Sequence, residues 1–273
     1  LDRILAQIEA TEYLGKFSGA TGTFAAHLAA DATQDWPAIS NKFVTSLGLT
    51  WNPLTTQIES HDWQAELYSR ISHANRVLHN LCTDVWTYIS MGYFRQIPQP
   101  GATGSSTMPH KINPIRFENA EANLELSSAL LDSLAATLVT SRLQRDLTDS
   151  TTQRNIGVAL GHSLLALDNI ERGLKEIDLN REALAADLDA NWEILGEAIQ
   201  TVIRAEVTAG RSSIADPYAI LKELTRGKRV GQAELVEFID GLDIGADAKA
   251  RLRELTPATY AGLASELVEY LAG

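Results

Sequence analysis

The sequence predicts an all-α fold, in which a bundle of long helices is followed by a small helical domain. Apolar residues recur at intervals of three and four over several long stretches, which places them on one face of a helix. Sustained alternation of apolar and polar residues, the pattern of strands, is not found in the sequence. The helical patterns become shorter after about residue 177, so we expect two domains, residues 1–177 and 178–273.

The bundle is expected to contain three long helices. The first begins near Asp62, and its predicted apolar stripe consists of Trp63, Leu67, Ile71, Ala74, Leu78, Leu81, Val85 and Tyr88. The stripe of the second consists of Leu124, Ser127, Leu131, Leu134 and Leu138. The third starts near Thr151, and its stripe consists of Ile156, Leu160, Ser163, Leu167, Ile170 and Leu174. Stripes of this length often continue into neighbouring subunits, so we expect a homo-oligomer.

Shorter elements are expected on both sides of the bundle. A helix over residues 36–47 and an extended piece over residues 54–58 precede it. Shorter helices follow it, over residues 181–189, 192–207, 217–225, 232–240, 246–255 and 257–271. Pro217 and Pro257 suit the first position of a helix, because the missing N–H is not needed there. The chain opens in a helical pattern without an initiator Met, so we expect a piece of a longer protein, with a processed N-terminus as the alternative.

The composition excludes several classes of function. The chain has 35 acidic and 23 basic residues and a formal net charge of -12. Nucleic acids and anionic membranes attract clustered Lys and Arg, so neither is an expected partner. The single cysteine, Cys82, excludes a disulfide framework and a cysteine-based zinc site, and it fits a reducing cytoplasm. We find no membrane-spanning apolar run and no signal peptide, and we expect no cofactor and no metal.

One stretch departs from the acidic character of the chain. Residues 93–117 contain no Asp or Glu but do contain three Lys or Arg residues and a histidine. Chance can produce such a gap, but in a chain with this net charge it favours a pocket for an anion between the helices. The stretch also interrupts the helical pattern, so the pocket is expected on a loop.

The order of residues within this loop indicates chemistry. Ser105 and Ser106 follow a glycine, which places hydroxyl and backbone N–H groups on a turn. Lys111 and Asn113 can supply a cation and an amide to one carboxylate. The Ser-x-x-Lys motif of a serine nucleophile is not formed, because the nearest lysine lies six residues after Ser105 and five after Ser106.

Two segments resemble a known family. GSSTMPHKIN, residues 104–113, matches the G-S-x-x-M-x-x-K-x-N signature of the fumarase/aspartase superfamily at every fixed position. His110 disfavours fumarase, aspartase and argininosuccinate lyase, and fits the adenylosuccinate lyases and the carboxymuconate cycloisomerases. SRLQRDLTDSTTQRN, residues 141–155, is similar to the corresponding segment of bacterial adenylosuccinate lyases. The resemblance covers nearly the whole chain, and it corresponds to the central bundle and the C-terminal domain of that family.

The resemblance to the adenylosuccinate lyases implies a β-elimination. Such enzymes release fumarate from adenylosuccinate, giving AMP, and from succinyl-aminoimidazole-carboxamide ribotide in purine biosynthesis. The resemblance implies that Ser105 is the base, and that Lys111 and Asn113 hold the carboxylate whose charge grows in the transition state. It implies substrate contacts, including nucleotide phosphate contacts, from Gln57, Ser106, Asn119, Arg145, Ser150 and Arg154.

Alternatives remain for several of these residues. Ser105 can be a plain turn residue, and Arg145 and Arg154 can pair with Asp146 and Asp149 instead of a phosphate. The protein can also be another lyase or a cycloisomerase of the superfamily, or a non-catalytic helical assembly module. An intact signature argues against the last, because a scaffold does not need the serine, the lysine and the asparagine together.

The resemblance further implies a homotetramer whose active sites combine several subunits. The family's acid is a histidine in a T-H-x-Q-P-A-T context, and none of the six histidines lies in such a context. The resemblance therefore implies that the acid lies in a missing N-terminal region, and residues 1–273 alone are expected to be inactive.

Overall fold

The computed structural model describes residues 1–97, 113–225 and 230–272. The chain divides into two compact units, Leu1–Asp178 and Leu179–Gly273. The described residues are mainly helical, and their strands are only two or three residues long. The predicted all-α fold is therefore confirmed.

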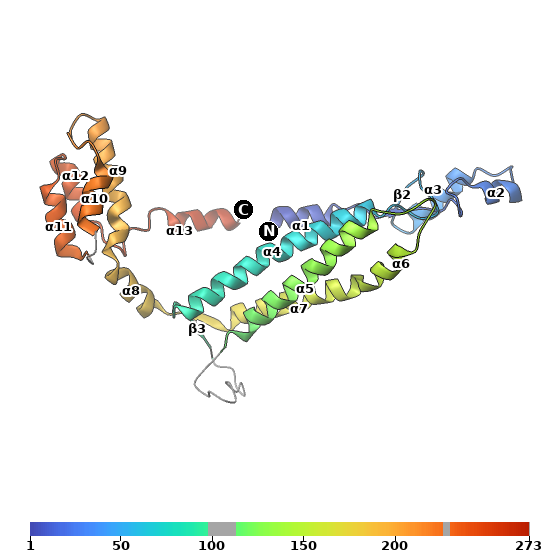
Figure 1. Ribbon diagram of the computed structural model, residues 1–273, viewed down its shortest axis with the longest axis horizontal. Coiled ribbons are helices and arrows are strands. Elements are labelled where there is room, and N and C mark those ends of the chain that lie inside the picture. Colours follow the sequence, from blue (N-terminus) through green and yellow to red (C-terminus); the bar gives the residue numbers. More distant parts are fainter. Residues whose placement is uncertain (98–112, 226–229, 273) are drawn as a thin grey trace. The chain divides into compact units, whose positions relative to one another are not determined.

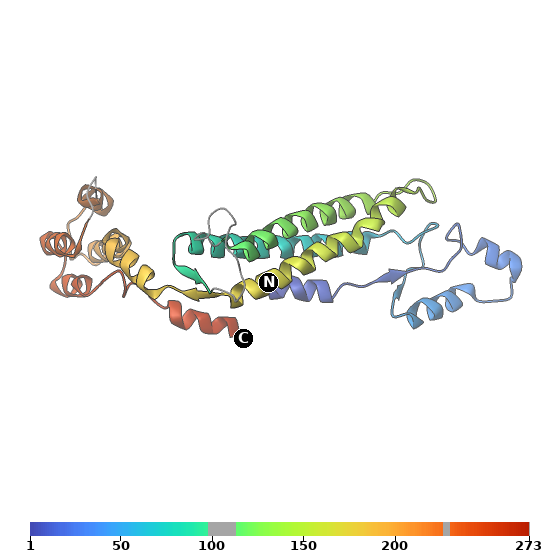
Figure 2. The same cartoon turned by 90° about the horizontal axis from the view of Figure 1, so that it is seen from below.

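Long helices form the bundle of the first unit: α4 (Asp62–Ser90), α5 (Ile115–Leu138) and α7 (Ile156–Lys175). They lie side by side in both views (Figures 1 and 2), and α5 packs against both of the others. Helix α1 (Asp2–Glu9) packs against α4. Arg70 on α4 joins the two, because its Nη1 donates to Gln7 O and to Thr11 Oγ1, both at 2.9 Å.

Short elements connect α1 to α4. They are β1 (Leu14–Gly15), α2 (Ala25–Ala30), α3 (Trp36–Ser46) and β2 (Thr50–Trp51). The side chain of Asp35 caps α3 by accepting from Ala38 N–H. Strands β1 and β2 pair in parallel. The extended piece expected at residues 54–58 is wrong, because the strand lies at residues 50–51 and the following carbonyls, of Thr56 and Gln57, bind the Lys16 side chain rather than another strand.

The remaining short elements of the first unit flank α5 and α7. They are β3 (Phe94–Gln96), α6 (Thr148–Thr152), η1 (Gln153–Asn155) and β4 (Ile177–Leu179), whose last residue begins the second unit. Strand β3 is hydrogen-bonded to β4. The expected third long helix is therefore three elements in succession, α6, η1 and α7.

A polar layer divides the core of the bundle. Asn75 Nδ2 on α4 donates to Ser127 Oγ on α5 and to Ser163 Oγ on α7, both at 3.0 Å. The two serine hydroxyls are 2.7 Å apart, and Ser163 also donates to Asn75 Oδ1 at 3.1 Å. One buried apolar cluster consists of Tyr68, Leu131, Leu134, Leu138 and Ala159. The other consists of Cys82, Val85, Phe117, Ala120, Leu124, Ala166 and Ile170.

The predicted stripes meet different outcomes. Every residue of the α5 stripe is buried, as predicted. On α4 the predicted stripe is partly wrong, because Leu81 and Tyr88 are exposed while Ser72 and Asn75 are buried. The physical reason is that these polar side chains find hydrogen-bond partners on α5 and α7, so their burial does not leave them unsatisfied.

The second unit consists of short helices: α8 (Arg181–Ala190), η2 (Trp192–Leu195), α9 (Gly196–Thr208), α10 (Pro217–Thr225), α11 (Gln232–Gly241), α12 (Ala246–Arg253), α13 (Ala264–Leu267) and η3 (Val268–Ala272). Its apolar core joins η2, α9, α11 and α12, with Ile203 of α9 fully buried. Pro217 opens α10 as predicted, and Asp216 Oδ1 caps it by accepting from the N–H groups of Tyr218 and Ala219.

The last expected helix is only partly present. Residues 257–263 form turns, and helical structure begins at Ala264 rather than at Pro257. Thr256 and Thr259 each accept the other's backbone N–H with the side-chain oxygen. These reciprocal bonds are those of a capping box, which marks a helix start after Thr256, but only turns follow it as far as residue 263.

Candidate functional site

Three predicted site residues, Ser105, Ser106 and Lys111, lie outside the described residues, as does His110. Asn113 is the first described residue after them, and it is exposed. It directly precedes Pro114, the N-cap residue of α5. The structure therefore places one member of the signature, next to the start of the central helix.

Glu176 binds the chain on both sides of this segment. Ile97 N–H, just before it, donates to Glu176 O at 2.8 Å. Arg116, just after it, donates from Nε and Nη2 to the Glu176 carboxylate, each at 3.3 Å. Both ends of the segment with the signature are thus held at one residue, which follows the end of α7.

Asn119 lies on α5, one turn after its start, and is exposed. Asn123 Nδ2 donates to Asn119 O at 2.8 Å and to its Oδ1 at 3.0 Å. His162 Nδ1 on α7 is 2.7 Å from Asn123 Oδ1, which requires a proton on this nitrogen because the amide oxygen can only accept. These bonds use one of the two lone pairs of Asn119 Oδ1 and do not involve its Nδ2 donors, so the exposed amide can still both donate and accept.

Two of the predicted substrate contacts come from loops that touch. Gln57 N–H donates to Gln144 O at 3.3 Å, so the chain at Gln57 lies one hydrogen bond from the residue that precedes Arg145. Gln57 is exposed and Arg145 is half-buried. The loop before α4 and the loop before α6 therefore present an amide and a guanidinium in one region of the first unit.

Arg145 is paired with an acidic residue, but one nitrogen of its guanidinium has no partner among the described residues. Arg145 Nη2 is 3.5 Å from Asp149 Oδ2, and His61 Nε2 is also 3.5 Å from that oxygen. Arg145 Nε and Asp149 Oδ1 are buried and have no hydrogen-bond partner in the part of the chain that is described. Arg145 is thus paired in this structure, as the alternative interpretation has it, yet part of its guanidinium is left for another group.

The two other predicted contacts follow closely. Ser150 is half-buried on α6, and Arg154 is exposed on η1. Asp146, one of the acidic residues expected to pair with Arg154, is bound instead by Arg142, whose Nη1 lies 2.9 Å from Asp146 Oδ2. Hydrogen bonds from Thr148, together with Arg142, hold the pKa of the Asp146 carboxyl below its ordinary value.

Sequence reasoning missed Glu59, which organises the turn into α4. This buried carboxylate accepts from Asn52 Nδ2 at 3.0 Å, from His61 N–H at 2.9 Å and from Trp63 Nε1 at 3.0 Å. His61 has a φ of 64°, a left-handed conformation that is uncommon for residues other than glycine. An acidic residue just before a predicted helix start is the one signal that could have indicated it.

The described residues contain no group of three or more His, Cys, Asp or Glu side chains that could hold a metal ion. None of their helices is long and apolar enough to cross a membrane. Cys82 is fully buried, and burial, with the neighbouring Glu121 charge, raises its thiol pKa to about 12. It is therefore not a nucleophile at neutral pH.

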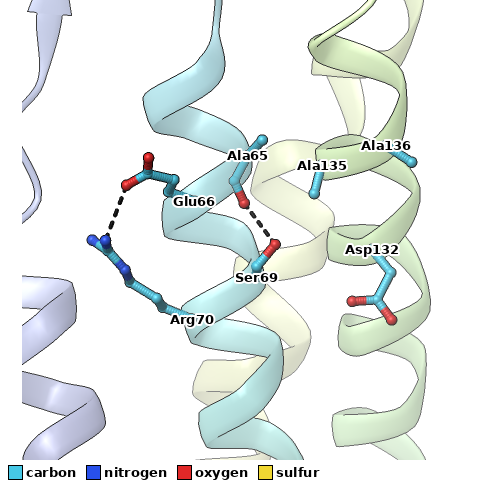
Figure 3. A pocket seen from close by; sticks show the side chains of 7 residues that line it. All are labelled: Ala65, Glu66, Ser69, Arg70, Asp132, Ala135 and Ala136. Atoms are coloured by element: carbon cyan, nitrogen blue, oxygen red, sulfur yellow. Dashed lines mark hydrogen bonds and ion pairs between the residues drawn. The ribbon is translucent and has the colours of Figure 1, made fainter.

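An open groove of about 630 Å³ lies between α4 and α5 (Figure 3). Ala135 and Ala136 line it on the α5 side, and Ser69, Glu66 and Arg70 line it on the α4 side. Ser69 Oγ donates to the backbone carbonyl of Ala65 at 2.8 Å, and Arg70 Nη2 pairs with the Glu66 carboxylate at 3.0 Å (Figure 3). None of the predicted site residues lines this groove.

The chain matches known proteins along almost its whole length. Residues 2–126 match the family described as Lyase, and residues 141–261 match the family described as Adenylosuccinate lyase C-terminal. The chain is 49% identical over 271 residues to the adenylosuccinate lyase of Escherichia coli (strain K12) and 48% identical over 272 residues to that of Haemophilus influenzae. It covers 58% of the length of each of these curated relatives.

Solved structures show the same fold. The 3-carboxy-cis,cis-muconate lactonizing enzyme from Pseudomonas putida is similar with a TM-score of 0.72 and 21% identity, over 98% of this chain and 59% of that one. The β-carboxy-cis,cis-muconate cycloisomerase from Acinetobacter calcoaceticus is similar with a TM-score of 0.68 and 14% identity, over 99% of this chain and 58% of that one. At these identities the likeness concerns the fold alone.

Proposed function

Because the chain belongs to the adenylosuccinate lyase family, we propose that the complete protein cleaves adenylosuccinate to AMP and fumarate. It also cleaves succinyl-aminoimidazole-carboxamide ribotide, as part of purine biosynthesis in the cytoplasm. The observation that carries this proposal is the 49% identity over 271 residues.

The proposed reaction is a β-elimination. Ser105 removes a proton from Cβ of the succinyl group, and the electron pair of that C–H bond delocalises into the carboxylate on Cβ. The pair then becomes the new C=C bond as the C–N bond at Cα breaks and its electrons leave with the nitrogen. Lys111 and Asn113 hold the carboxylate that carries the developing negative charge, which stabilises the transition state more than the substrate. An acid outside residues 1–273 protonates the leaving nitrogen. A protein made of these residues alone is therefore expected not to cleave the substrate.

The remaining residues bind the rest of the substrate. Arg145, Ser150 and Arg154 contact the nucleotide phosphate, and the unpaired Arg145 Nε supports this role. An arginine is well suited to this task, because its donors form a fixed planar fork. The other contacts come from Gln57, Ser106 and Asn119.

The proposed assembly is a homotetramer with active sites shared between subunits. Support comes from large apolar side chains that are exposed on the long helices of the first unit: Val77, Leu81, Leu126, Val158, Leu164 and Leu165. Apolar surface of this extent on a bundle is typical of an interaction surface. Light scattering at micromolar concentration should give a tetramer, and a monomer would contradict the proposal.

An assay of fumarate and AMP formation from adenylosuccinate tests the activity. In the complete protein, Ser105→Ala should lower turnover by about 10²–10⁴-fold, the usual effect of losing a general base. Ser90→Ala is the matched control, because among the described residues the hydroxyl of this exposed serine donates to Thr87 O in its own helix turn. Near-normal turnover of Ser105→Ala would refute the role of the serine.

Mixing subunits tests the shared site. Residues 1–273 alone should form no fumarate. Added to complete Ser105→Ala protein, they should restore activity, because a mixed tetramer joins an intact serine to an acid from the other chain. Fumarate from residues 1–273 alone would show that the acid lies inside them.

A further inference from the structure

The ammonium group of Lys16 binds three backbone carbonyls from two separate segments of the chain. Its Nζ donates to Gln57 O at 2.7 Å, to Gly19 O at 2.8 Å and to Thr56 O at 3.2 Å. An ammonium group has three donors and no acceptor, so three carbonyl oxygens use its full capacity. Two of these carbonyls lie about forty residues away in the sequence, beside one of the proposed substrate contacts.

The chain around Lys16 is packed tightly against the same loop. Gly22 has a φ of 71°, and a Cβ there would lie 1.9 Å from Thr55 O, so only glycine fits. Phe17 O accepts from the buried Ser40 hydroxyl of α3 at 2.6 Å. The backbone that carries Lys16 is therefore held in place by its contacts with the loop at Thr55 and with α3.

Gln57 is held through its backbone from both directions. Its carbonyl accepts from Lys16, and its N–H donates to Gln144 O at 3.3 Å. Its side chain takes no part in either bond, and the residue is exposed. Fixing the backbone on both sides limits where the side-chain amide can reach, without using the amide itself.

We propose that Lys16 is a positioning residue, which aims the Gln57 amide at the substrate by binding the Gln57 backbone carbonyl. This inference rests on the proposed function, since Gln57 needs a substrate to contact. Lys16 does not touch the substrate itself. Burial lowers the pKa of Lys16, because taking the ammonium out of water disfavours its charged form.

The test is a double-mutant cycle in the complete protein, with cleavage of adenylosuccinate as the readout. Lys16→Met keeps the aliphatic length but removes the three donors, and Gln57→Ala removes the proposed contact. Each should lower kcat/KM by about tenfold or more, because a misplacement of about 1 Å can cost 10²-fold. If Lys16 acts through Gln57, the double variant should be no worse than Gln57→Ala alone.

Two further variants keep the test sharp. Lys42→Met is the control for removing a lysine charge, because Lys42 is exposed on α3, and it should match the wild type. Lys16→Gln retains two donors, so its kcat/KM should lie between those of the wild type and Lys16→Met, and it can be measured even if Lys16→Met folds poorly. The kcat/KM of the double variant Lys16→Gln/Gln57→Ala should equal that of Gln57→Ala alone.

The outcomes separate the two proposals. Wild-type protein without adenylosuccinate cleavage would refute the proposed function. An active wild type with normal kcat/KM in Lys16→Met and Lys16→Gln would overturn only the role of Lys16. Equal losses from the Lys16 changes with and without Gln57 would show a purely structural role, which also overturns the inference. A Gln57→Ala variant with wild-type kcat/KM would overturn it as well, since there would be no contact to aim.

Discussion

The two units of the chain build their cores differently. The core of the second unit joins apolar residues from several short helices, and among its described residues the buried Glu206 lies beside it, bound by Arg211 at 2.7 Å. The bundle of the first unit has two smaller apolar clusters with the layer of Asn75, Ser127 and Ser163 between them. The centre of the bundle therefore contains a layer of hydrogen-bonded side chains, whereas the core cluster of the second unit consists of apolar side chains.

The difference teaches how each unit specifies its structure. Apolar contacts are strong but tolerate shifts of packing, whereas a buried hydrogen bond is lost when the helices slide. Long helices can slide past each other by one turn, and short helices joined by tight turns cannot. We therefore expect the polar layer to fix the register of α4, α5 and α7, at a cost in stability that the second unit does not bear.

The largest effect is expected in the second unit. Ile203 is 0% exposed, so Ile203→Ala should lower the free energy of unfolding by about 2–5 kcal/mol through lost burial and a cavity. Urea unfolding followed by hydrogen exchange should show the loss in α9, α11 and α12. Val207→Ala, at an exposed position of the same helix, should change it by about 0.5 kcal/mol or less. Equal effects of the two would contradict the apolar core.

A smaller effect is expected in the bundle. Asn75→Ala leaves Ser127 and Ser163 bonded only to each other, and it should cost about 1–3 kcal/mol. Asn80→Ala, on the exposed face of α4, should cost about 0.5 kcal/mol or less. Replacing all three polar residues by apolar ones should restore stability while weakening the choice of register. A triple variant less stable than Asn75→Ala would refute this reasoning.

Acid should act on the second unit through Glu206. The hydrogen bond from Arg211, and the N–H of Gly245, lower the pKa of this carboxyl below its ordinary 4.5. Because the folded-state pKa is the lower one, the stabilisation is present above pH 4.5 and is lost as pH falls through the folded-state value. Urea midpoints of the wild type and Glu206→Gln should therefore differ at pH 7 and converge in acid. A constant difference would contradict the assignment.

The smallest expected effect is the rate at which an alkylating reagent labels the Cys82 thiol in the folded bundle. With a thiol pKa of about 12 and a fully buried sulfur, alkylation at pH 8 should be very slow until the bundle opens. The labelling rate, followed by mass spectrometry, should rise in Asn75→Ala and stay unchanged in Ile203→Ala. Fast labelling of the wild type would contradict the burial of this thiol.

The sequence predicted elements better than their partners. The α5 stripe was correct because its buried positions, apart from Ser127, are Leu and follow the helical period. The α4 stripe failed at Asn75, whose burial depends on serines 52 and 88 residues away. Gln57 and Arg145 were found through a resemblance, but nothing local shows that a hydrogen bond links their loops. Lys16 gave no signal, because a lysine that binds carbonyls looks like any other in a sequence.

The anchoring at Glu176 has a consequence for how the signature segment can change. Because Ile97 and Arg116 both bind Glu176, the secondary structure around them already brings the ends of residues 98–112 together. The remaining loop-closure entropy grows only with the logarithm of length, by about 0.6 kcal/mol for each doubling. Insertions and deletions between these anchors therefore change the entropy of closing the chain only slightly.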